Sequence, residues 1–76
     1  MSTMRILGRK GDESVTWTAT DEVTTQAAAE TFAERMLNGY LAFSMPATPS
    51  DGKGVIIKEF DPNAENIILA PPISGG

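Results

Sequence analysis

The stretch TDEVTTQAAAETFAERMLNG, residues 20–39, decides the fold of this 76-residue chain, because it carries the signals of an amphipathic helix from start to end. Thr20 or Asp21 can cap the first backbone N–H groups of such a helix. Its apolar residues recur along one side at helical spacing, and they are Ala28, Ala29, Phe32, Ala33 and Met36. Gly39 suits the left-handed conformation in which many helices end. We therefore predict a helix over Val23–Leu37 that packs through this apolar stripe.

Apolar runs of strand length lie on both sides of the predicted helix. They are Thr3–Leu7 and Ser14–Ala19 before it, and Tyr40–Met45, Val55–Phe60 and Ile67–Ala70 after it. In the second run, Val15, Trp17 and Ala19 fall on one face and hydroxyl side chains on the other, which is the period of a half-buried strand. Glycines at both ends mark Gly8–Gly11 as a turn, and proline with glycine marks 46–54 as a loop.

The predicted order of elements is strand, strand, helix, strand, strand, strand, with a turn at 61–66 before the last strand. One amphipathic helix across one face of a mixed sheet is a two-layer α+β arrangement that buries the apolar faces of both. The same order of elements is found in the β-grasp. We therefore expect an α+β β-grasp domain over 1–70, with a mixed sheet of four to five strands and one packed helix, and a flexible tail over 71–76.

The composition argues against several classes of function. The chain has no histidine and no cysteine, which removes the commonest general base, Ser-His and Cys-His triads, disulfides and thiolate metal sites. The spacing of Asp51, Glu59, Asp61 and Glu65 does not match a calcium-binding loop. Ten acidic against six basic residues give a net charge of −4, which argues against a nucleic-acid partner. We expect a cytoplasmic, monomeric protein that is not itself an enzyme, binds no metal, and has no membrane segment.

The most informative feature is the end of the chain, PPISGG at residues 71–76. Gly75 and Gly76 lack a Cβ atom, so they can lie extended in a channel too narrow for other residues. Pro71 and Pro72 favour a stiff extended conformation, which holds such an end away from the domain. A tail of this kind can present its α-carboxylate to an enzyme that activates it. The alternative is an inert, frayed terminus.

The last ten residues, IILAPPISGG, resemble the C-terminus of the sulfur-carrier branch of the ubiquitin-like β-grasp proteins, in particular the small subunit of molybdopterin synthase. The resemblance implies that a partner adenylating enzyme, using ATP and Mg²⁺, adenylates Gly76. The adenylate then becomes a thiocarboxylate for a sulfur-acceptor enzyme, or joins an amine of a target protein. The residues that would thread into the partner are Pro71, Pro72, Ile73, Ser74 and Gly75. The tail lacks the arginines that precede Gly-Gly in ubiquitin, which favours the sulfur carrier.

Partner binding is also expected at an apolar patch on the sheet face opposite the helix, where ubiquitin-like folds dock partners. Tyr40, Phe43 and Phe60 are the candidates, and the sequence leaves open which of them faces outward. A different class of function is an interaction or structural subunit with an inert tail, and a third is an acidic binder of basic partners, which added salt would weaken. A phosphate-binding loop at Gly8–Gly11 is a minor alternative to a hairpin turn, because the full motif is absent.

Overall fold

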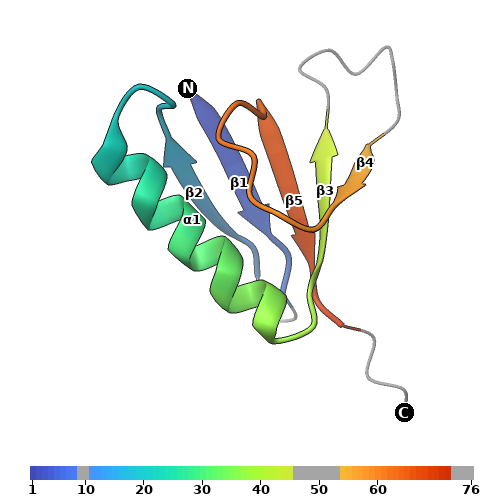
Figure 1. The fold of residues 1–76 in the computed structure, drawn as a ribbon. Helices are drawn as coiled ribbons and strands as arrows, with labels where there is room; N and C mark the ends of the chain where they lie inside the picture. The colour runs from blue at the N-terminus through green and yellow to red at the C-terminus, as the bar shows by residue number, and fades with distance from the viewer. Residues whose placement is uncertain (9–10, 46–53, 73–76) are drawn as a thin grey trace.

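A mixed sheet with a helix across one face forms the domain (Figure 1). The computed structural model describes residues 1–8, 11–45 and 54–72. The strands in that part of the chain are β1 (Ser2–Ile6), β2 (Glu13–Trp17), β3 (Leu41–Met45), β4 (Val55–Ile57) and β5 (Asn66–Ala70), and the helix is α1 (Glu22–Leu37). The strand order is β2-β1-β5-β3-β4, in which β1 and β5 run parallel and the other neighbours antiparallel. The α+β class and the order of elements are as predicted, and the arrangement is compatible with a β-grasp.

Local signals in the sequence fix both ends of α1. The carboxylate of Asp21 accepts a hydrogen bond of 3.1 Å from the backbone N–H of Val23, so Asp21 is the N-cap. At the other end Gly39 adopts a φ of 88°. The N–H groups of Gly39 and Tyr40 each donate a 3.1 Å hydrogen bond to carbonyls of the last helical turn. This pattern of bonds satisfies carbonyls that the end of a helix otherwise leaves free, and it turns the chain directly into β3.

The N-cap gives a first testable prediction. Replacing Asp21 by alanine removes the acceptor of the Val23 N–H, and we expect the free energy of unfolding to fall by about 1 kcal/mol. Urea denaturation followed by circular dichroism measures the change. The matched control is Gln26→Ala, an exposed position in the same helix, for which we expect a change within about 0.5 kcal/mol. Equal midpoints for the two variants would contradict the capping role.

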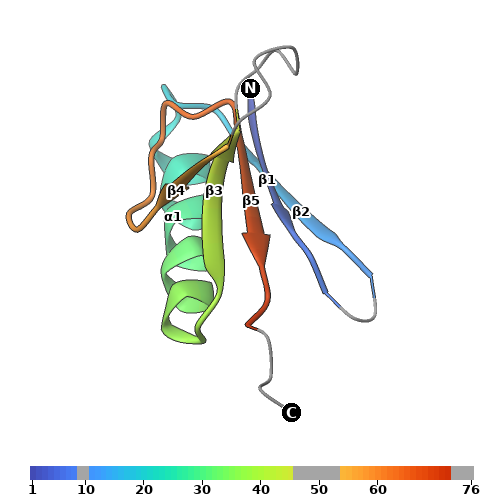
Figure 2. The same ribbon diagram turned by 90° about the vertical axis from the view of Figure 1, so that its right-hand side faces the viewer.

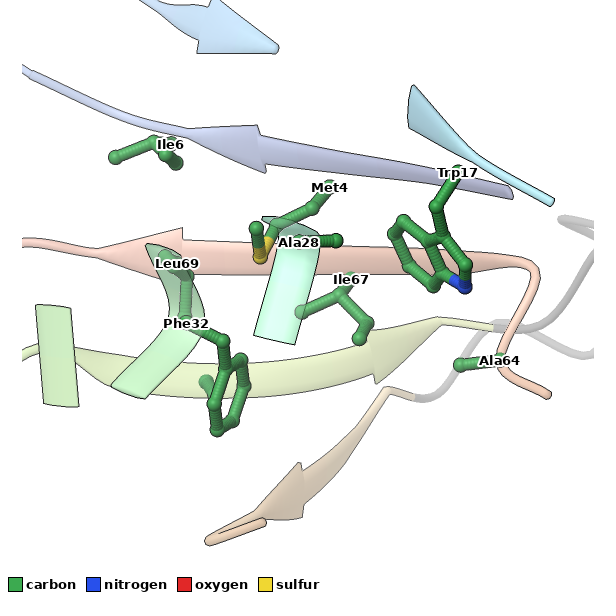
Figure 3. Packing of buried hydrophobic residues seen from close by; sticks show 9 residues of the cluster. Met4, Ile6, Trp17, Ala28, Phe32, Ala64, Ile67 and Leu69 are labelled. Carbon is green, nitrogen blue, oxygen red and sulfur yellow. The ribbon is translucent and has the colours of Figure 1, made fainter. Parts of the chain in front are cut away.

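The hydrophobic core lies between α1 and the sheet (Figure 3). Its buried residues are Met4, Ile6, Trp17, Ala28, Phe32, Ala42, Ala64, Ile67 and Leu69. From the helix, Ala28 and Phe32 are buried and Met36 packs against them half-buried, as the stripe predicts. Ala33 was predicted in the same stripe but is exposed. It lies about 100° around the helix from Phe32, which takes it beyond the surface that meets the sheet.

Two predicted strands extend more than one residue too far. Ala19 is exposed in the turn before α1, because β2 ends at Trp17. β4 ends at Ile57 instead of Phe60, because the chain bends at 58–59 and crosses to the helix side of the sheet (Figures 1 and 2). The crossing segment, residues 58–65, places Phe60 with its ring centroid 5.0 Å from that of Trp17. It thereby covers one end of the core.

Candidate functional site

The tail begins at the end of a strand that is held on both sides. β5 lies between β1 and β3, and its last residue, Ala70, pairs with Leu41. On the other side, the N–H of Leu7 donates a 2.9 Å hydrogen bond to the carbonyl of Leu69. Pro71 and Pro72 follow, and both are exposed. We call residues 70–72 the tail root.

The tail root lies beside the C-terminal end of α1 (Figure 1). A Cβ atom built on Gly39 would stand 3.6 Å from the Cβ of Pro72, which is ordinary van der Waals contact. The glycine that ends the helix therefore also borders the tail root. Four of the predicted site residues, Ile73, Ser74, Gly75 and Gly76, lie outside the described residues.

Tyr40 lies on the helix side of the sheet. Its side chain packs against the core, and the guanidinium of Arg35 stands 5.6 Å from the centroid of its ring. Arg35 also forms a 3.3 Å ion pair with Glu13 of β2, which joins the last turn of α1 to the edge of the sheet. Phe60 packs against the core on the same side, with its ring centroid 5.7 Å from that of Phe32.

Of the three predicted aromatic residues, only Phe43 lies on the face opposite the helix. Its neighbour Ala42 is fully buried against the core, and successive strand residues point to opposite faces. Phe43 is half-buried there and pairs with Ile56 of β4 and Ile68 of β5. The apolar patch that was predicted from aromatic residues is therefore built mainly from aliphatic ones.

We call the strand side chains that point away from α1 the open face. Figure 2 shows that α1 lies along the other side of the sheet. By register and alternation, the apolar members of the open face are Leu41, Phe43, Met45, Ile56, Ile68 and Ala70, on β3, β4 and β5. Its polar members are Thr3, Arg5, Ser14, Thr16 and Asn66, mostly on β1 and β2. Leu41 is 52 % exposed and Ile56 is 62 % exposed, so the apolar half is open to water at two of its strands.

The other candidate features give less support for a function than the tail root and the open face. The N–H of Gly11 donates a 3.4 Å hydrogen bond to the carbonyl of Gly8, and the described residues that follow lead into β2 and not into a helix. Arg9 and Lys10 of the predicted turn lie outside the described residues. Among the residues that the structure describes, no three acidic side chains are grouped so that they could hold a metal ion. Within the same residues, α1 is not a helix of the length and apolarity that crossing a membrane requires.

Three comparisons with known proteins found no match for this chain. No protein-family model matches the chain, and neither a curated protein nor a solved structure matches it. The functional interpretation therefore rests on the tail root and the open face.

Proposed function

We propose that this chain is a ubiquitin-like β-grasp carrier protein whose Gly76 α-carboxylate is activated by a partner adenylating enzyme. The observation that carries the proposal is the end of β5. A strand inside the sheet stops at Ala70 and continues into exposed Pro71 and Pro72, beyond which the sequence reads Ile-Ser-Gly-Gly. The strand order, with α1 between β2 and β3, supports the β-grasp assignment.

The tail root has the two properties that a carrier needs. Its start is firmly held, because Leu69 and Ala70 are bonded or paired to strands on both sides. Its continuation cannot extend the sheet, because Pro71 and Pro72 have no N–H to donate to a neighbouring strand. A fixed origin followed by a narrow end suits uptake into an enzyme channel, since glycine has no side chain to obstruct it.

The chemistry proceeds in two balanced steps on the partner. The Gly76 carboxylate attacks the α-phosphorus of ATP, pyrophosphate leaves, and an acyl adenylate forms. Hydrosulfide then attacks the acyl carbon and forms a C–S bond. The bond between the acyl carbon and the phosphate oxygen breaks, AMP leaves, and a thiocarboxylate results. The partner supplies the catalytic groups and the Mg²⁺, while this chain presents the carboxyl group. Attack by a lysine amine in place of hydrosulfide gives an amide and makes the chain a protein modifier.

A second function is favoured by the open face. Exposed Leu41 and Ile56 together with Phe43 form an apolar surface of the kind that marks protein interfaces. In this second function the chain is an interaction subunit of a larger assembly, and its tail is inert. The two functions differ in whether Gly76 is required.

Intact-mass spectrometry tests the proposal. The purified chain is incubated with each purified adenylating enzyme from its source genome, together with ATP, Mg²⁺ and sulfide. We expect one enzyme to produce the mass gain of a single sulfur-for-oxygen exchange, and to produce none when ATP is omitted. An unchanged mass with every enzyme would contradict the carrier function. Full activity of a chain lacking Gly76 in its native context would support the interaction subunit.

A further inference from the structure

We propose that Asn38 is a site of spontaneous covalent modification. The backbone nitrogen of Gly39 attacks its side-chain amide, ammonia is lost, and water converts the product to aspartate and isoaspartate at the end of α1. This inference stands apart from the proposed function, because the chain reacts with water alone and needs no partner enzyme. It depends on three observations: the sequence at the helix end, the hydrogen bonds that hold it, and its position beside the tail root.

The end of α1 carries the residue pair that this reaction needs. Asn38-Gly39 is the only asparagine-glycine pair in the chain, since the other two asparagines precede Ala64 and Ile67. The backbone nitrogen after an asparagine can attack the side-chain carbonyl carbon, and glycine hinders that attack least because it has no side chain. Asn38 and Gly39 are both exposed, so water has access to the intermediate.

The fold itself requires these two residue types at this position. Gly39 adopts a φ of 88°, in the left-handed region where a residue with a Cβ atom is strained. The Nδ2 of Asn38 donates a 3.0 Å hydrogen bond to the carbonyl of Glu34, which the end of a helix otherwise leaves free. The residues that end the helix are therefore also the reactive pair.

The reaction has two balanced steps. The Gly39 nitrogen forms a bond to the Cγ atom of Asn38, the C–N bond of the side-chain amide breaks, and ammonia leaves with the proton that the nitrogen loses. A five-membered succinimide ring results. Water then adds to one of the two ring carbonyl carbons. Breaking the bond from nitrogen to Cγ gives aspartate, and breaking the bond from nitrogen to the backbone carbonyl carbon gives isoaspartate, whose main chain runs through Cβ.

The folded helix end holds the pair in an unreactive geometry. The ψ angle of Asn38 is 10°, so the Gly39 nitrogen nearly eclipses the backbone nitrogen of Asn38, whereas ring closure requires it to eclipse Cβ. The Gly39 N–H also donates a 3.1 Å hydrogen bond to the carbonyl of Met36. Reaction therefore requires the last turn of α1 to open, with loss of this bond and of the bond to Glu34.

Few contacts oppose that opening. Leu37 is 89 % exposed and Asn38 is exposed, so neither side chain holds the last turn to the core. The turn is tied to the rest of the domain through Arg35, which forms the 3.3 Å ion pair with Glu13 and lies over the ring of Tyr40. Exposed ends of elements open at a lower free energy than the whole domain unfolds. Local opening of the helix end, limited by Arg35, therefore sets the rate.

The products change the helix end in charge and in length. A carboxylate at residue 38 lies at the negative end of the helix dipole, which is unfavourable, and it lacks the Nδ2 donor that bonded to Glu34. Isoaspartate also adds one atom to the main chain between α1 and β3. Because Gly39 borders Pro72, and Leu41 pairs with Ala70, this atom is inserted beside the tail root (Figure 1).

Peptide mapping by mass spectrometry, after incubation at mildly alkaline pH, tests the site. We expect the mass gain of an amide-to-acid exchange at Asn38 at least about tenfold faster than at Asn63 and Asn66, because glycine leaves the attack unhindered. Unfolding in urea is expected to speed the reaction at Asn38 at least about tenfold further, since no helix end then has to open. Equal rates at Asn38 and Asn63 in the folded chain would overturn the proposal.

Two substitutions at opposite ends of α1 test the opening step. Arg35→Ala removes the ion pair and the ring contact, and we expect the rate at Asn38 to rise about threefold or more. Asp21→Ala weakens the other end of the helix, and we expect the rate to stay within about twofold. Equal rates in the two variants, whether raised or unchanged, would overturn local opening as the step that sets the rate.

Nuclear magnetic resonance tests the effect on the tail root. The isoaspartate product is separated from the unmodified chain, and the backbone amide signals of the two are compared. We expect shifts at Leu41 and Ala70 and none at Trp17, which pairs with the opposite end of β1. Asn38→Asp is the matched control, since it carries the charge without the added atom, and its shift at Ala70 should be smaller. An Ala70 signal that isoaspartate leaves unchanged would overturn the effect on the tail root.

Discussion

Replacing Trp17 by alanine is expected to lower the free energy of unfolding by about 3–5 kcal/mol, the largest loss from any single substitution that we predict. Trp17 is 1 % exposed, and its ring packs against that of Phe60 at 5.0 Å between centroids. Its indole N–H donates a 3.0 Å hydrogen bond to the carbonyl of Pro62. The variant therefore loses packing, an aromatic contact and the bond that fastens the crossing segment.

The size of the domain makes this loss serious. Small domains bury a lower share of their surface than large ones, and total stabilities of about 5–15 kcal/mol are usual. In a chain whose total stability is near the lower end of this range, a loss of about 3–5 kcal/mol would leave a substantial unfolded fraction. Urea denaturation measures the free energy of unfolding of the variant. Far-ultraviolet circular dichroism follows the transition, because the variant lacks the only tryptophan as a fluorescent reporter.

Trp17→Phe separates the contribution of the aromatic ring to the free energy of unfolding from that of the hydrogen bond, and Val23→Ala is the exposed control. Trp17→Phe keeps an aromatic ring but leaves the Pro62 carbonyl without its donor, and we expect a smaller loss of about 1–3 kcal/mol. Val23→Ala, at a position 78 % exposed, should change the free energy by less than about 0.5 kcal/mol. If Trp17→Ala unfolded at the same urea concentration as Val23→Ala, the crossing segment would not be held as the structure shows.

The sequence predicts those features of the fold that depend on neighbouring residues. The cap at Asp21, the glycine at 39 and the spacing of Ala28, Phe32 and Met36 are all local signals, and the helix lies within one residue of its predicted range. The alternation around Trp17 likewise placed β2 correctly, although it continued into Ala19. The pattern does not show where hydrogen bonding to β1 stops, and pairing with β1 ends the strand at Trp17.

The side of the sheet on which each aromatic residue lies depends on contacts between distant parts of the chain. Tyr40 is turned toward the core where the chain leaves α1, beneath Arg35, and Phe60 is turned there by the bend after β4. Neither residue lies in a strand, so alternation says nothing about its direction. Phe43 does lie in a strand, and the burial of its neighbour Ala42 shows its direction only once the sheet is known.

An apolar patch on this face was expected, but most of the residues that build it were missed for the same reason. Arg5, Ile56 and Ile68 come from three strands that are far apart in the sequence, and only the strand order brings them to one surface. The alternation of β5, in which Ile67 and Leu69 are buried, was a usable signal that Ile68 faces the other way. The absence of carboxylates from this face becomes visible only when the register is known.

Deleting Gly76 is expected to abolish tail activation, with the rate of ATP-pyrophosphate exchange falling at least about a hundredfold. The shortened chain still ends in a glycine carboxylate, but that group lies up to about 3.5 Å short of the position it would need to reach the α-phosphorus of ATP. Misplacement of a reacting group by about 1 Å is enough to cost roughly a hundredfold in rate. Gly76→Ala keeps the length and adds one Cβ atom, so it tests the narrowness of the channel separately.

The fold provides the internal control for this result. β5 ends at Ala70, so removing residue 76 takes away no strand residue, and we expect an unchanged melting temperature. Ser74→Ala is the matched variant, since it alters the tail without changing its length or its last two glycines. Exchange at the original rate by the chain without Gly76 would show that the terminal carboxylate is not the group that reacts.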